Sequence, residues 1–201
     1  SPSAAVDLAA GDGPIDLLVK AALVAAITAV NIVGARSRGR LNDVLTVAKV
    51  APLALLVVLA AAFVVVRPAT AGSNLQPFLP LGLGGFGAAA LLIFWAYAGF
   101  ELAVLPAGDV RDPGRTLPLG LIVGMIVATA FYLLTALAVT VALPWHDVAT
   151  SPRPLGGALE ALLAGLGLPS RWGEALMAAG ALVSIIGVYD VFTLSVARLG
   201  Y

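Results

Sequence analysis

The chain has 201 residues, of which 61% are hydrophobic and 11% are charged. Soluble domains are closer to half apolar and a quarter charged, so this composition indicates an integral membrane protein. The formal net charge is zero and cysteine is absent, which gives no basis for nucleic-acid binding and excludes disulfides and cysteine metal sites within the chain. We therefore predict no nucleic-acid partner, no metal and no cofactor.

Five segments are long and apolar enough to cross a membrane as helices, which takes about 20 mainly apolar residues. They cover residues 15–34, 44–66, 85–105, 117–143 and 174–196. Such unbroken runs differ from the alternating pattern of a membrane β-barrel. The sequence thus predicts an all-α fold, a polytopic membrane helical bundle that forms a single partial transmembrane domain over residues 1–201. Because the chain starts in a loop and stops directly after an apolar run, we expect a fragment of a longer protein.

Short arginine-rich loops indicate the cytoplasmic side of a multi-pass membrane protein. Loops 35–43 and 107–116 carry Arg36, Arg38, Arg40, Arg111 and Arg115. We predict that both loops are cytoplasmic, in a protein of the plasma (inner) membrane. The loops on the opposite side are longer, and residues 156–168 in one of them have the pattern of a short interfacial helix.

The third predicted span is not an ordinary membrane helix. Gly99 interrupts its apolar run, Glu101 places a carboxyl group inside that run, and a proline and a glycine at positions 106 and 108 end it. An unwound turn at bilayer depth frees backbone N–H and C=O groups to bind a ligand. We therefore predict a broken helix with non-helical backbone between Ala96 and Phe100.

Lys49, Glu101 and Asp190 are ionisable residues inside apolar runs. Each costs roughly 2.5–3.5 kcal/mol on insertion scales, which suggests a function. Simpler roles stay open: Lys49 could extend its ammonium to the headgroups, and both carboxyl groups could pair within the bundle. The chain has no nucleotide-binding loop, zinc-protease motif or serine–histidine–aspartate set, so the sequence does not indicate an enzyme.

Two consecutive motifs carry a family resemblance. The stretch FWAYAGFE (residues 94–101), followed by GDVRDPGRTLP (residues 108–118), resembles the sixth helix and following loop of amino-acid permeases of the amino acid–polyamine–organocation superfamily. Asp109 and Asp112 replace the usual Glu and Asn. The resemblance implies a partial leucine-transporter-like inverted-repeat fold, with this chain covering about helices four to eight.

The resemblance also implies roles for individual residues. The substrate-binding positions are Trp95, Ala96, Tyr97, Ala98, Gly99 and Phe192. Trp95 matches an aromatic gate over the substrate, and Glu101 matches a carboxylate that helps to close the site. Lys49 matches a lysine of proton-coupled members that occupies the sodium position of sodium-coupled relatives, with Ser184 as a hydroxyl near it. Desolvation favours a neutral amine, so such a lysine can take up and release a proton.

These observations predict an amino-acid permease, which moves an amino acid or related amine by alternating access with proton coupling or as an exchanging antiporter. Its partners would be the substrate, protons, the lipid bilayer and the missing helices of the same full-length protein. A sodium-coupled symporter of the same fold is one alternative. A non-transporting membrane sensor or structural subunit is another.

Overall fold

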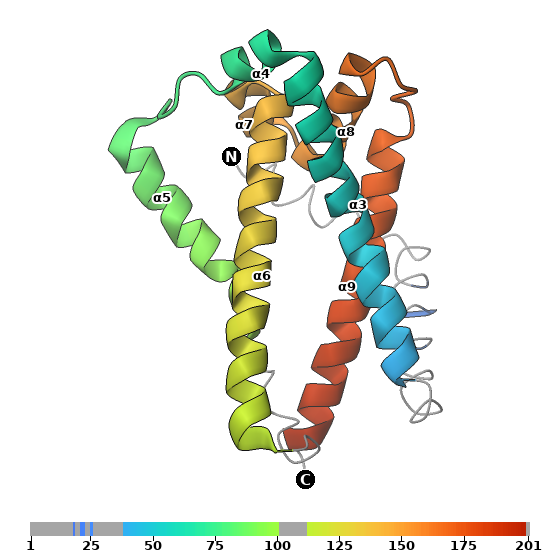
Figure 1. Ribbon diagram of the computed structural model, residues 1–201. Coiled ribbons are helices and arrows are strands. Elements are labelled where there is room, and N and C mark those ends of the chain that lie inside the picture. Colours follow the sequence, from blue (N-terminus) through green and yellow to red (C-terminus); the bar gives the residue numbers. More distant parts are fainter. Residues whose placement is uncertain (1–17, 19–20, 23–24, 26–37, 101–111, 200–201) are drawn as a thin grey trace, which may run out of the picture. The chain divides into compact units, whose positions relative to one another are not determined.

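The computed structural model describes residues 18, 21, 22, 25, 38–100 and 112–199. All regular secondary structure in these ranges is helical (Figure 1), which confirms the all-α prediction. The chain divides into one unit formed by Ser1–Leu45 and Ile185–Tyr201 and a second unit formed by Thr46–Ser184. The contacts described below lie within the second unit. The single transmembrane domain over residues 1–201 stays a prediction.

Two described helices are long and apolar enough to span a membrane. Helix α3 covers Arg38–Val66 and contains the apolar span Val44–Val66, and α6 covers Pro113–Ala142. Only 22% and 11% of these two spans are buried inside the protein. A core helix of a soluble protein would be mostly buried, so the exposed apolar surface suits a lipid environment.

Two further apolar helices are α5 (Gly82–Trp95) and α9 (Gly173–Leu199). Three short helices connect the long ones: α4 (Pro68–Asn74), α7 (Trp145–Thr150) and α8 (Pro154–Gly165). The predicted helix over residues 15–34 lies mostly outside the described residues. Residues 26–37 and 101–111, which include much of both predicted arginine-rich loops, also lie outside them.

The helices that follow the two predicted arginine-rich loops already include residues that the sequence assigns to those loops. Helix α3 begins at Arg38, inside predicted loop 35–43, and α6 begins at Pro113, inside predicted loop 107–116. Pro113 suits the first turn of a helix, where its missing N–H group has no helical partner to lose. The backbone of Asp112 takes the left-handed conformation with φ of 54°, and its carbonyl accepts bonds from the N–H groups of Arg115 and Thr116. Helix α6 therefore begins directly after Asp112.

The apolar core lies near the C-terminal ends of α3 and α6. Its largest fully buried side chains are Leu56 on α3 and Leu159 and Leu162 on α8. The ring of Phe63 lies so close to Gly165 that a Cβ atom there would not fit. Helix α8 forms where the sequence predicts a short helix, but Leu159 and Leu162 pack into the protein instead of facing a membrane interface, whereas Leu155 is exposed. Helix α4, which follows α3, and helices α7 and α8, which follow α6, therefore lie at the same end of α3 and α6 (Figure 1).

One side chain ties α4 to the last turn of α6. The Nδ2 group of Asn74 donates a hydrogen bond of 2.9 Å to the carbonyl oxygen of Val141. Carbonyl groups in the last turn of a helix have no helical donor, so this bond satisfies a group that would otherwise lack a partner.

We expect Asn74→Leu to lower the free energy of unfolding by about 1–3 kcal/mol, because it leaves the part-buried Val141 carbonyl without its donor. Denaturant unfolding of the detergent-solubilised protein measures the change. Ser73→Ala is a matched control, since among the described residues the Ser73 hydroxyl bonds only to the Thr70 carbonyl one turn away. Equal unfolding curves for the two variants would contradict a stabilising role for Asn74.

Candidate functional site

Helix α5 ends at Trp95, and residues 96–99 form a turn. The N–H groups of residues 96, 97 and 98 donate to carbonyls three residues earlier, with N···O distances of 2.9, 3.2 and 3.1 Å. An α-helix would connect each N–H group to the carbonyl four residues earlier, so the backbone has left the α-helical path. The structure therefore confirms the predicted break in the third apolar segment.

Gly99 gives this turn its direction. Its φ angle is +106°, which side-chain-bearing residues rarely adopt, whereas a Cβ atom built on Gly99 would meet no atom within 4 Å. Glycine is needed here for its backbone conformation: a side chain would fit in the space, but a residue with a Cβ atom is strained at this φ angle. The interruption that Gly99 makes in the sequence thus has a direct structural counterpart.

An aromatic cluster surrounds the turn. The Tyr97 ring meets the Tyr132 ring edge to face, with 5.5 Å between centroids and an interplanar angle of 87°. The centroid of the Tyr97 ring also lies 6.4 Å from that of the Phe100 ring, with an interplanar angle of 30°. Such edge-to-face and offset arrangements are favourable beyond the area that they bury. These ring contacts hold the side chain of Tyr97, which extends from the turn to α6.

Two hydroxyl groups of α6 bond to the turn. Tyr132 donates from its Oη atom to the carbonyl oxygen of Ala96 over 2.8 Å, and the hydroxyl oxygens of Tyr97 and Thr129 lie 2.8 Å apart. Thr129 also donates to the Met125 carbonyl over 2.8 Å. Since a threonine hydroxyl has one proton, Tyr97 is the donor to Thr129.

The sequence did not predict Thr129 and Tyr132 as site residues. Their spacing was the available signal: two hydroxyl side chains three residues apart lie on one face of a helix. That signal says only that the face is polar, and it does not identify the segment that packs against it. The contact with residues 96 and 97 is evident only from the structure.

Four other predicted site residues are either exposed or lie outside the described residues. Trp95 is the last residue of α5 and its side chain is 82% exposed. Ala98 is also exposed. Glu101 lies outside the described residues, and so does the side chain of Phe192 on α9. The gating and substrate-binding roles of these residues stay predictions.

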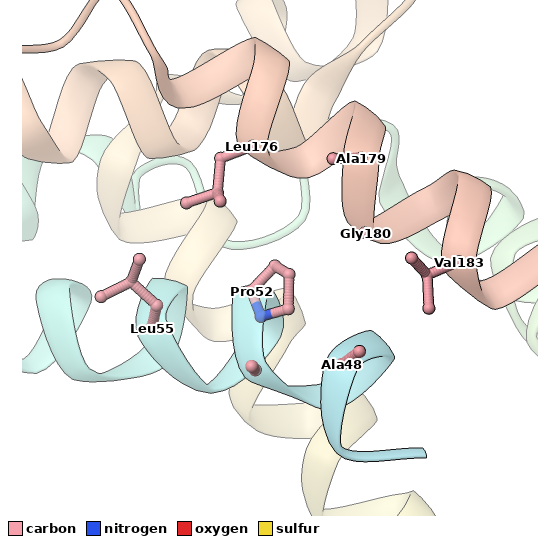
Figure 2. A pocket seen from close by; sticks show the side chains of 8 residues that line it. Ala48, Pro52, Leu55, Leu176, Ala179, Gly180 and Val183 are labelled. Atoms are coloured by element: carbon pink, nitrogen blue, oxygen red, sulfur yellow. The ribbon is translucent and has the colours of Figure 1, made fainter. Parts of the chain in front are cut away.

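An apolar groove of about 300 Å³ runs between α3 and α9 (Figure 2). Pro52 and Gly180 face each other in its middle, where a Cβ atom on Gly180 would lie 2.7 Å from the Pro52 Cγ atom. Ala48 and Val183 line one end. The absence of a side chain at Gly180 lets the two helices approach closely there.

Lys49 and Ser184 directly follow the two residues at that end of the groove, Ala48 and Val183. Both side chains are half-buried. In the described part of the chain the ion pairs lie elsewhere, between His146 and Asp147 and between Arg153 and Glu174. The structure thus places Lys49 and Ser184 on the two helices that form the groove.

Lys49 lies deeper in its helix than the sequence predicts. Because α3 already includes Arg38, Lys49 is eleven residues, or about 16 Å, from the first described residue of this helix. The apolar span itself begins at Val44, only five residues before Lys49. A lysine at that depth can still extend its ammonium to the headgroups, so this alternative stays open.

Long exposed apolar helices and a helix that breaks at a glycine define an integral membrane protein of the helical-bundle class. A family model described as amino acid permease matches residues 5–201, and the chain belongs to this family. This confirms the resemblance found in the sequence.

Three relatives illustrate the range of the family. The chain is 32% identical over 138 residues to the branched-chain amino acid permease BcaP of Bacillus subtilis, which covers 69% of the chain and 28% of the relative. It is 33% identical over 126 residues to cationic amino acid transporter 5 of Arabidopsis thaliana, covering 63% of the chain and 21% of the relative. It is 29% identical over 133 residues to the methylthioribose transporter of Bacillus subtilis, covering 66% of the chain and 28% of the relative.

The matched part of the chain thus spans less than a third of each of these relatives. No solved structure matches the chain. The relatives are named as permeases and transporters, in agreement with the expectation that the protein is not an enzyme.

Proposed function

We propose that the chain is part of an amino-acid permease, a secondary transporter that moves an amino acid or related amine across the membrane by alternating access. The observation that carries this proposal is the turn over residues 96–99 at the end of an apolar helix, in a chain of the amino acid permease family. Such a turn offers backbone groups to a polar ligand at bilayer depth. The remaining helices of the bundle would come from the rest of the complete protein.

The substrate's ammonium group would bind at the turn. A carbonyl oxygen has two lone pairs, and Tyr132 uses only one of those on Ala96. The described side chains around the turn are mostly aromatic, with Trp95, Tyr97 and Phe100 contributing their rings. These rings suit the apolar side chain of leucine, and arginine is the second candidate because aromatic faces also attract a guanidinium group; relatives are named for each class.

Proton coupling would use Lys49, with Ser184 as a hydroxyl partner when the site changes access. The support is the position of Lys49: half-buried, inside an apolar span, and beside the groove between α3 and α9. A sodium-coupled symporter is the alternative, but an ammonium group in the cation site would repel sodium. Trp95 and Glu101 would act as the gate on the substrate side.

The uptake of labelled leucine and arginine by the complete protein in proteoliposomes tests the proposal. We expect leucine to accumulate when the pH gradient is imposed and not when a sodium gradient replaces it. Accumulation driven only by sodium would indicate the symporter. Saturable binding without uptake would indicate a sensor, and neither binding nor uptake of either amino acid would contradict the proposed function.

We also predict the membrane orientation, with the residues around Arg36 and Arg115 in the cytoplasm and α7 and α8 outside. Single cysteines introduced by Ser37→Cys and Ser151→Cys, in a background free of other cysteines, should react with an impermeant thiol reagent from opposite sides. Permeabilised membranes, in which both cysteines should react, are the control. Reaction of both cysteines from one side of intact membranes would show that the number of spans between them is wrong.

A further inference from the structure

The two hydroxyl contacts from α6 reach consecutive residues of the turn. Tyr132 bonds to the backbone carbonyl of Ala96, and Thr129 accepts a bond from the side chain of Tyr97. One contact therefore fixes the peptide plane after Ala96, and the other fixes the ring of the next residue. Both come from one face of α6, three residues apart.

We propose that Thr129 and Tyr132 are positioning residues of the substrate site, which hold the turn in the shape that receives the substrate's ammonium group. This inference rests on the proposed function. It concerns α6, a helix that the sequence did not connect with the substrate site.

The Tyr132 bond determines where the Ala96 carbonyl points. A carbonyl outside a helix can rotate with its peptide plane, and each direction that it samples lowers the fraction of protein ready to bind. The hydroxyl of Tyr132, 2.8 Å away, holds one lone pair of this oxygen and so orients the other. An ammonium group is a strong, charge-assisted donor, so the second lone pair is a suitable acceptor for it.

Thr129 acts on the same turn through Tyr97. Because the Thr129 proton is directed to the Met125 carbonyl, its oxygen presents an acceptor to the Tyr97 hydroxyl. The Tyr97 ring is then held edge to face with Tyr132 at 5.5 Å. Removing the Thr129 hydroxyl frees the end of the Tyr97 side chain, which loosens the turn without deleting any ring.

A purely structural role for these hydroxyls makes a different prediction. If they only stabilise the fold, their loss lowers stability and affects all ligands alike. If they position the Ala96 carbonyl, their loss weakens ligands that carry an ammonium group and spares analogues that lack one. The comparison of an amino acid with its des-amino analogue therefore separates the two roles.

The experiment uses the complete protein with Tyr132→Phe and Thr129→Val, each of which removes one hydroxyl and keeps a similar shape. Thr140→Val is the matched control, since within the described part of the chain that hydroxyl bonds only to the Ala136 and Leu137 carbonyls of its own helix. The probes are L-leucine and 4-methylpentanoate, the same molecule without its amino group. If the wild type takes up arginine instead, the probes are L-arginine and 5-guanidinopentanoate.

Losing one positioning hydrogen bond should raise the KM for the amino acid by roughly three- to tenfold, with little change in maximal rate. The inhibition constant of the des-amino analogue should stay at the wild-type value, and Thr140→Val should resemble the wild type for both ligands. The thermal unfolding midpoints of all three purified variants should lie close to that of the wild type.

Three results would overturn the inference. The first is a wild-type KM in both Tyr132→Phe and Thr129→Val. The second is an equal loss of affinity for the amino acid and for its des-amino analogue. The third is a loss of folded protein in both variants but not in Thr140→Val, which would make the hydroxyls structural. A wild-type protein that neither binds nor takes up leucine or arginine would instead refute the proposed function, and the inference with it.

Discussion

Gly99→Ala is expected to lower amino-acid uptake by roughly five- to 150-fold, because a non-glycine residue at this backbone angle costs on the order of 1–3 kcal/mol. Gly99 has φ of +106°, and an open space surrounds the position where a Cβ atom would lie. The alanine side chain would therefore clash with no neighbour, and the penalty would fall on the backbone conformation. To relieve it, the turn would rotate Gly99 toward negative φ and move the carbonyl groups of residues 96–98.

The matched control is Gly87→Ala, a glycine of α5 where a Cβ atom would likewise meet no atom within 4 Å. Gly87 lies within a regular helix, where alanine is more favourable than glycine by roughly 0.5–1 kcal/mol. This variant should transport at the wild-type rate. Uptake by Gly99→Ala at the level of Gly87→Ala would show that the positive φ of the turn is not needed for transport.

Lys49→Met is expected to abolish proton-driven accumulation and to leave only equilibration of substrate across the membrane. With one proton per substrate, a gradient of one pH unit sustains about a tenfold accumulation ratio in the wild type. In the variant the ratio should fall to about one, since no group remains to exchange the proton. Methionine is flexible and of similar length, so it fills the space beside the α3–α9 groove.

Lys49→Arg separates proton exchange from a simple need for positive charge. Arginine keeps the charge and can also extend to the headgroups, but it does not release its proton in proteins. Loss of accumulation in both variants would support proton exchange at Lys49. Accumulation by Lys49→Arg with unchanged pH dependence would assign Lys49 to the headgroup region, and Glu101 would be the next candidate for coupling.

The break after α5 could be predicted because its cause is local. Glycine is the residue that adopts a φ of +106° at little cost, and Gly99 is conspicuous within an apolar run. The all-helical class followed in the same way from the length and composition of the apolar segments. Both features are determined by residues that are neighbours in the sequence, so they can be predicted without knowing which helices pack together.

Features that depend on which helices meet could not be predicted. The role of Tyr132 requires that α6 packs beside residues 96 and 97, and no local pattern shows this. The leucines of α8 fit a membrane interface as well as a protein core, and the packing of α8 against neighbouring helices, chiefly α6, decides that Leu159 and Leu162 are buried. Helix α6 begins at Pro113, four residues before the predicted span over residues 117–143, because Pro113 occupies the first turn and Pro118 lies inside the helix.

The most direct test of the substrate site is protection of a cysteine placed in the turn. Ala98→Cys, in a background free of other cysteines, introduces a thiol at an exposed position of the turn, and Ala90→Cys introduces one at an exposed position of α5. Modification of the two thiols by a small water-soluble reagent is followed with and without saturating leucine, or with arginine if that is the substrate. We predict that the substrate slows modification at residue 98 by roughly tenfold or more and leaves residue 90 unaffected. Equal rates at residue 98 with and without a substrate that the variant still transports would contradict a substrate site at this turn.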